Sequence, residues 1–366
     1  MIFSPDNGAL SSCLPPGTEP GGPLTTQLGP LTLAHPLINA SGTFDLLEAA
    51  EVLGQEFVAR PPVAAYVPKT VTLHARRGNE PPRLVETASG LMNSIGLPNQ
   101  GVEEFCRHDL PRLLGLPCPL IVNVAGFTPE EYVLAVERLR WALDEALGVY
   151  GSACAASSPS AAPYVAGRDE AARPKPAWAW RVGLEVNISC PNVHSGCMSI
   201  GTDPDETFAL LRALREVWPE PALLVAKLTP NVTDIQAVAE AAERGGAGAL
   251  ALVNTFKGLV LDPVSLRPLL GGVTGGLSGP AIKPLALRAV FEVRQRVGIP
   301  LIGIGGVETV VDVVDFLAAG ASVVAVGAAG FRDPCLPARL AGELGEQLRR
   351  RSLSLAELIG VAHAAG

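Results

Sequence analysis

The chain has 366 residues, of which 48% are hydrophobic and 17% are charged. This composition supplies a large core and excludes wholesale disorder. The net charge of -8 argues against a nucleic-acid partner or an anionic membrane surface, because both select for clustered lysine and arginine. An anionic small substrate would therefore need local positive charge.

Residues 1–24 are rich in Gly, Pro and Ser, which predicts a flexible N-terminal extension. They contain no basic region followed by an apolar run, and no apolar stretch of about 18 residues occurs in the chain. We therefore expect a cytoplasmic protein without a membrane segment. The seven cysteines lack CxxC pairs and the histidines are scattered, so the spacing indicates neither disulfides nor a metal or iron–sulfur site.

Thr25–Leu33 predicts a small hairpin, and residues 25–366 predict one domain. Eight short apolar runs follow, each of them before a longer stretch of helical periodicity. The predicted strands are Pro36–Gly42, Ala64–Thr72, Leu120–Gly126, Gly183–Ser189, Ala222–Thr229, Gly248–Thr255, Pro300–Gly306 and Ser322–Ala329.

Helices are predicted between these strands, among them Pro129–Ala146, Asp205–Val217 and Asp234–Arg244. Eight such units favour a closed (β/α)₈ TIM barrel of the α/β class, with an open doubly wound sheet as the alternative. Residues at about 147–180 interrupt the repeat with an Ala/Ser/Pro-rich insertion between the third and fourth strands. A connection of that length is either mobile or a contact surface, and we favour mobile.

Polar residues gather at the carboxyl ends of these strands, where barrel enzymes place their sites. Lys69 and Lys227 each follow an apolar run, where an ammonium needs an anion or hydrogen-bond partner. Taken singly, each could instead extend into solvent. Asn123, Asn187 and Asn254 suit a planar heterocycle, although asparagine at a strand end often caps the backbone.

Gly305 and Gly306 follow the seventh strand, and Gly327 and Ala328 follow the eighth. Backbone amides free of bulky side chains at these positions favour a phosphate site, although a glycine pair can also serve a tight turn. No dinucleotide fingerprint occurs in the required context, which favours a mononucleotide such as FMN.

Cys190 follows the fourth strand on a loop that we expect to face the site, whereas free cysteines are more often inert and buried. The chain carries four motifs in this order: Val67–Thr70, Met92–Asn99, Glu185–Asn192 and Gly275–Pro284. On these motifs it resembles dihydroorotate dehydrogenase from about Leu31 onward.

The resemblance implies that FMN lies across the barrel mouth and that the substrate dihydroorotate lies against the flavin. The implied FMN residues are Ser41, Lys69, Thr70, Asn123, Asn187, Lys227, Val253, Gly279, Gly305, Gly306, Gly327 and Ala328. The implied substrate residues are Lys69, Asn93, Ser94, Ile95, Gly96, Leu97, Asn187, Asn254 and Thr255. Lys69 would supply positive charge beside the substrate carboxylate.

The implied reaction is oxidation of dihydroorotate to orotate in pyrimidine (UMP) biosynthesis. Cys190 would remove the C5 proton while hydride passes from C6 to flavin N5. A cysteine base corresponds to the class without a membrane helix, and Glu86–Gly90 and Gly201–Pro204 resemble its NAD-linked form. That form passes electrons to a separate FAD and iron–sulfur subunit, and we also expect a homodimer.

Two alternatives remain open from the residues alone. One is another FMN-dependent barrel oxidoreductase that acts on a neutral pyrimidine base. The other is a non-catalytic barrel that binds a phosphorylated ligand or a protein partner. A colourless purified protein would favour the second.

Overall fold

Eight parallel strands form the central sheet in a computed structural model that describes residues 21–147, 176–189 and 200–364. Their order is β3-β14-β13-β10-β9-β8-β7-β4, which confirms the eight predicted strands. The strands are β3 (Leu37–Asn39), β4 (Val71–Thr72), β7 (Leu120–Ala125), β8 (Val182–Asn187), β9 (Leu224–Lys227), β10 (Ala249–Leu252), β13 (Leu301–Ile304) and β14 (Val323–Val326).

The segment that leads into β4 joins the two ends of this sheet. The amide of Ala64 donates to the carbonyl of Leu37 at 2.9 Å. The Asn39 side chain then binds both backbone groups of Val67, with Nδ2 2.6 Å from its carbonyl oxygen and Oδ1 2.9 Å from its amide nitrogen. These bonds close the barrel, so the barrel prediction is confirmed over the open sheet.

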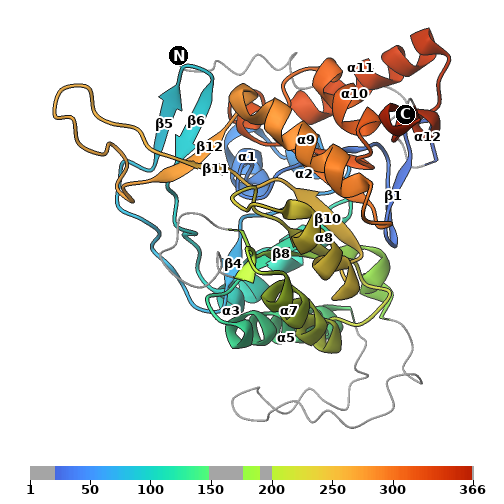
Figure 1. The fold of residues 1–366 in the computed structure, drawn as a ribbon. Helices are drawn as coiled ribbons and strands as arrows, with labels where there is room; N and C mark the ends of the chain where they lie inside the picture. Colours follow the sequence, from blue (N-terminus) through green and yellow to red (C-terminus); the bar gives the residue numbers. More distant parts are fainter. Residues whose placement is uncertain (1–20, 148–175, 190–199, 365–366) are drawn as a thin grey trace.

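Helices surround the barrel (Figure 1). Three of them match predictions closely, and they begin at the side-chain caps Thr128, Asp203 and Asp234. The α-helices are α1 (Leu46–Leu53), α2 (Glu56–Ala59), α3 (Val102–Glu104), α4 (Leu110–Leu114), α5 (Pro129–Ala146), α7 (Pro204–Val217), α8 (Ile235–Arg244), α9 (Lys283–Arg294), α10 (Val310–Ala318), α11 (Leu336–Arg351) and α12 (Leu355–Leu358). Within the described residues, the other helical segments are a π-helix, η2 (Phe105–Asp109), and the 3₁₀ turns η4 (Ala177–Trp180), η5 (Pro280–Ile282), η6 (Ala328–Phe331) and η7 (Val361–His363).

The predicted hairpin is present as β1 (Thr26–Leu28) and β2 (Leu31–Leu33). Its leucines are fully buried in one cluster with barrel-interior residues such as Val225 and Ile302. The Thr26 hydroxyl donates to the carbonyl of Ser322, just before β14 begins. The hairpin therefore closes the amino-terminal end of the barrel and leaves the carboxyl end available for a site.

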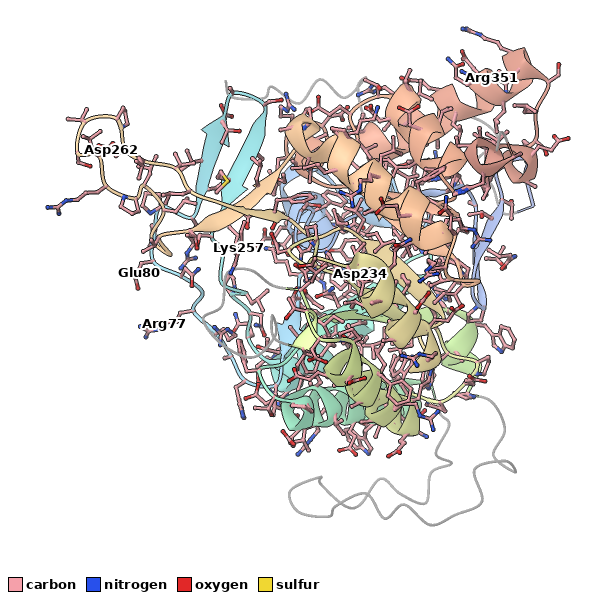
Figure 2. The ribbon with its side chains drawn as sticks, viewed as in Figure 1. Arg77, Glu80, Asp234, Lys257, Asp262 and Arg351 are labelled. Atoms are coloured by element: carbon pink, nitrogen blue, oxygen red, sulfur yellow. The ribbon has the colours of Figure 1, made fainter. Side chains whose placement is uncertain are left out.

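A second, antiparallel sheet was not predicted. It pairs β5 (Leu84–Thr87), β6 (Gly90–Asn93), β12 (Gly275–Ser278) and β11 (Phe256–Gly258). These strands come from the connections after β4 and β10, so they stand beside the barrel mouth (Figure 1). The loop between β11 and β12, which carries Asp262, projects away from the barrel (Figure 2). Glycine-rich strands such as β12 have weak local propensity and form through distant partners.

The described end of the predicted insertion packs in the hydrophobic core of the protein through Trp178. Trp178 in η4 is 1% exposed, and its indole nitrogen donates to Asp144 Oδ1 at 2.7 Å. Its ring lies 4.6 Å from the ring of Trp218. Residues 148–175 of the predicted insertion and residues 1–20 of the predicted extension lie outside the described residues.

Among the three cysteines that the structure describes, one differs from expectation. Cys335 is disulfide-bonded, whereas the sequence spacing indicated no disulfides. Spacing along the chain says little about a pair that only the fold brings together. Cys106 and Cys118 are free, and burial raises the pKa of each thiol to about 12. Both thiols therefore stay protonated and unreactive at neutral pH.

Candidate active site

One cavity of about 520 Å³ lies at the carboxyl ends of the barrel strands, bordered by the second sheet. Except for Asn123 and Ser94, every cofactor and substrate residue predicted from the sequence lines it. Cys190, the predicted base, lies outside the described residues, but its neighbour Ser189 is described. Residues from distant parts of the chain thus converge on one space large enough for a mononucleotide.

Lys227 lies in the floor of the cavity and is 6% exposed. Its Nζ is 3.7 Å from Oε1 of Glu185, which is 2% exposed. The same carboxylate oxygen accepts a hydrogen bond from Asn123 Nδ2 at 2.5 Å. Asn123 therefore lies below the cavity lining and contacts the floor through Glu185. Its Oδ1 is buried without a hydrogen-bond partner among the described residues.

A second polar network joins the ends of β8 and β10. The Ser189 hydroxyl donates to Asn187 Oδ1 at 3.0 Å and accepts from Asn254 Nδ2 at 2.7 Å. The amide of Thr255 donates to Asn254 Oδ1 at 2.8 Å. These bonds orient the two predicted asparagines and hold the backbone that immediately precedes Cys190.

Lys69 enters the cavity from the segment before β4 and is half exposed. Its ammonium pairs with Asp45 at 3.2 Å and with Glu48 at 3.8 Å. Solvent-exposed pairs of this kind contribute at most about 1 kcal/mol. An anionic ligand can therefore compete for the Lys69 ammonium at little cost.

Two glycines bring bare backbone to the other end of the cavity. Gly279 has φ 95° and Gly306 has φ 70°, values that disfavour residues with a side chain. A Cβ at Gly306 would lie 2.8 Å from the Gly279 carbonyl oxygen, and one at Gly279 would lie 2.6 Å from the Cα of Gly90. Gly327 and Ala328 border the same end at the start of η6. This cradle suits a phosphate group.

The predicted substrate segment follows β6. Asn93 Nδ2 donates to the carbonyl of Gly276 at 3.1 Å, which ties this segment to β12. Ile95, Gly96 and Leu97 line the cavity. Ser94 is fully buried and its hydroxyl accepts from Asn79 Nδ2 at 3.0 Å, so its side chain faces away from the lining residues.

Sequence reasoning did not assign a role to Glu185, Ser189 or Arg83. Arg83 lines the cavity from the connection before β5. For Glu185 a signal was available, since residues two apart on a strand share a face and Asn187 was already a candidate. A carboxylate within an otherwise apolar strand also needs a partner.

The glycine cradle and the two lysines fit a phosphorylated heterocyclic cofactor. A family model described as dihydroorotate dehydrogenase matches residues 23–160 and 180–348. The chain belongs to the dihydroorotate dehydrogenase family. It is therefore an oxidoreductase of dihydroorotate, and the family resemblance read from the four motifs is confirmed.

Several relatives carry a more specific name, "Dihydroorotate dehydrogenase B (NAD(+)), catalytic subunit". The protein of Desulforudis audaxviator is 43% identical over 340 residues, covering 92% of this chain and 96% of the relative. That of Pelobacter propionicus is 40% identical over 341 residues, covering 92% and 97%. That of Carboxydothermus hydrogenoformans is 38% identical over 343 residues, covering 93% and 97%.

A solved structure supports the fold assignment. The crystal structure of DHODH in complex with ferulenol from Eimeria tenella aligns with a TM-score of 0.69 and covers 97% of this chain and 93% of that one. Its sequence identity is 20%, so the likeness shows the fold alone. In the part of the chain that the structure describes, no helix has both the length and the apolar character needed to cross a membrane.

Proposed function

We propose that the cavity binds FMN and dihydroorotate together and that Cys190 is the base of the oxidation. The observation that carries this proposal is the convergence of the predicted cofactor and substrate residues on one cavity. The phosphate would lie on the backbone of Gly279, Gly305, Gly306, Gly327 and Ala328. The ring would lie over Lys227 and Asn187 with Lys69 and Thr70 beside it.

The chain's own groups would bind and orient the substrate. Lys69 would pair with the dihydroorotate carboxylate in place of Asp45. Asn93, Asn187 and Asn254 would hydrogen-bond the amide edges of the pyrimidine ring, since each offers a donor and an acceptor. This arrangement would present the substrate C5 proton to Cys190.

FMN, when bound, supplies the acceptor for the hydride that leaves C6 of dihydroorotate. The chain's own residues would then hold the substrate against the flavin and remove one proton. Burial of Lys227, Asn187 and Thr70 keeps water away from the floor of the cavity, which strengthens the polar interactions there.

Anaerobic titration of the purified holoenzyme tests this proposal. We expect flavin absorbance in the purified protein and bleaching of that absorbance by dihydroorotate. Dihydrouracil should leave the flavin oxidised, because it lacks the carboxylate that Lys69 would bind. Equal bleaching by both compounds would favour a reductase of neutral pyrimidine bases, and a colourless protein would favour a non-catalytic ligand-binding barrel.

We further propose that electrons leave the flavin for NAD through a separate FAD and iron–sulfur subunit, and that the catalytic chain is a homodimer. The support for an NAD-linked partner is the name of the relatives, which describes a catalytic subunit of an NAD-linked enzyme. Affinity purification of the chain from its own cells should recover a flavin and iron–sulfur protein. Sedimentation of the purified chain should give the mass of a dimer.

The insertion offers a separate test of partner binding. Its described ends, Leu147 after α5 and Pro176 before η4, flank the amino-terminal side of β8, away from the cavity at the carboxyl ends. Replacing residues 150–174 with a short Gly/Ser linker should therefore leave the flavin content and the recovered partner unchanged. Loss of the partner alone would assign the insertion to the interface.

A further inference from the structure

Glu185 is a buried carboxylate directly beneath the cavity, and the reaction proposed above gives it no role. It does not line the cavity, so among the described residues it acts through two polar neighbours. Those neighbours are the Lys227 ammonium at 3.7 Å and the Asn123 carboxamide at 2.5 Å. Lys227 does line the cavity.

Strand register explains how these three side chains meet. Asn123 on β7 is the direct partner of Glu185 on β8, and Asn187 on β8 is the direct partner of Lys227 on β9. Residues two apart on β8 share a face, so Glu185 and Asn187 both point into the barrel. The three side chains therefore come from three consecutive strands of the barrel.

Burying one ammonium without a counter-charge costs several kcal/mol, and a paired carboxylate offsets most of that cost. The Glu185–Lys227 pair thus makes the floor of the cavity close to neutral while Lys227 still offers its donors upward. Charge beneath a flavin ring changes how readily the ring is reduced, because reduction adds negative charge to it.

We propose that Glu185 is a positioning residue that neutralises Lys227 and thereby sets the reduction potential of the bound flavin. The inference rests on the proposed function, since it requires FMN above Lys227. With the pair intact, the ring stands over a floor of nearly zero net charge. Loss of Glu185 leaves a cation beneath the ring, and loss of Lys227 leaves an anion.

The test is the midpoint potential of the bound flavin in purified holoenzyme, measured by equilibrium dye titration. Glu185→Gln keeps an acceptor for Asn123 and should shift the potential to more positive values. Lys227→Met should shift it to more negative values. The double variant carries no charge in the floor and should return close to the wild-type potential.

Asp144 provides a matched control in the same chain. It is also a buried carboxylate, with Arg140 Nε at 3.7 Å and the Trp178 indole nitrogen at 2.7 Å. Asp144→Asn should lower the stability of the protein and leave the flavin potential unchanged. A merely structural role for Glu185 would make the two carboxamide variants behave alike.

The outcomes separate this inference from the proposed function. Flavin-loaded Glu185→Gln with an unaltered potential would overturn the inference and leave FMN binding intact. Wild-type protein without flavin would overturn the proposed function itself. If Glu185→Gln fails to fold, Lys227→Met and the double variant with both substitutions still test the inference. The inference requires that adding Glu185→Gln reverses the shift in flavin potential caused by Lys227→Met.

Discussion

The side-chain amide of Asn254 donates a hydrogen bond to the hydroxyl of Ser189, with 2.7 Å between Nδ2 and Oγ. The two residues are 65 positions apart in the chain. Ser189 follows β8 and Asn254 follows β10, so both lie at the carboxyl ends of barrel strands. Ser189 is fully buried and immediately precedes Cys190. The bond therefore couples the proposed substrate residue Asn254 to the backbone that carries the proposed base.

Removing this hydroxyl should reduce turnover without removing the cofactor. We expect Ser189→Ala to lower kcat by about tenfold, equivalent to about 1.4 kcal/mol, because the hydroxyl's hydrogen bonds to Asn187 and Asn254 are lost. Stopped-flow measurement of flavin reduction checks the value. Thr26→Val is the control, since it removes a buried hydroxyl at the opposite end of the barrel. Equal losses in both variants would argue against a specific role for Ser189.

Cys190→Ala should keep FMN and lose the proton-transfer step. General acid–base groups contribute about 100-fold to 10,000-fold to rates, so we expect flavin reduction by dihydroorotate to slow by at least about 100-fold. Visible absorbance of the purified variant reports retained FMN. Cys197→Ala should behave like the wild type, and a comparable loss there would show that Cys190 is not the base.

The phosphate cradle should fail when a side chain is added at Gly306. The φ of 70° disfavours alanine, and the new Cβ would lie 2.8 Å from both the Gly279 carbonyl oxygen and the Lys283 Cβ. We expect Gly306→Ala to be purified with little or no FMN, as measured by absorbance after heat release. Gly330→Ala is the control, because its Cβ would meet nothing within 4 Å. Full flavin content in Gly306→Ala would place the phosphate elsewhere.

His35 should make the stability of the protein depend on pH. Burial lowers its pKa from 6.5 to about 4, so the unfolded chain binds a proton more readily between these values. The contribution is fully present above pH 6.5 and is lost as the pH falls toward 4. The loss amounts to about 3 kcal/mol.

Urea unfolding between these two pH values measures the effect. The difference in free energy of unfolding between wild type and His35→Gln should change by about 3 kcal/mol across the window, since only the wild type carries the titrating ring. A constant difference would show that His35 titrates alike in the folded and unfolded chains.

Trp178 should stabilise the fold through its indole nitrogen as well as its ring. Trp178→Phe keeps most of the packing against Trp218 but removes the donor to Asp144. We expect a loss of about 1–3 kcal/mol in the free energy of unfolding, because a buried carboxylate oxygen loses its partner. Trp180→Phe is the matched control, since Trp180 is 55% exposed in the same turn. Similar losses in both variants would contradict this assignment.

Much of the barrel was predictable because its signals are local. The run Leu120–Gly126 became β7, and Pro129–Ala146 matches α5 to the residue. Alternation of short apolar runs with capped amphipathic helices depends on neighbours within about one turn or one strand. The side-chain cap at Thr128 is an example, since its bond reaches only to Glu131.

The second sheet was not predictable from such signals. In β12 and β6, Gly276 pairs with Asn93 and Ser278 pairs with Leu91, positions more than 180 residues apart. Neither strand has a strong preference of its own, and each is stabilised by the other. The sheet nevertheless borders the cavity and positions Asn93 in its wall.

By itself the sequence determined the order of the βα units and the polar residues that end them. Those features depend on short-range periodicity and on turn chemistry. Only the tertiary structure decided which polar residues face one another, as Glu185 faces Lys227 and Ser189 faces Asn254. Register and barrel closure set those pairs, because both depend on hydrogen bonds between strands that are far apart in the chain.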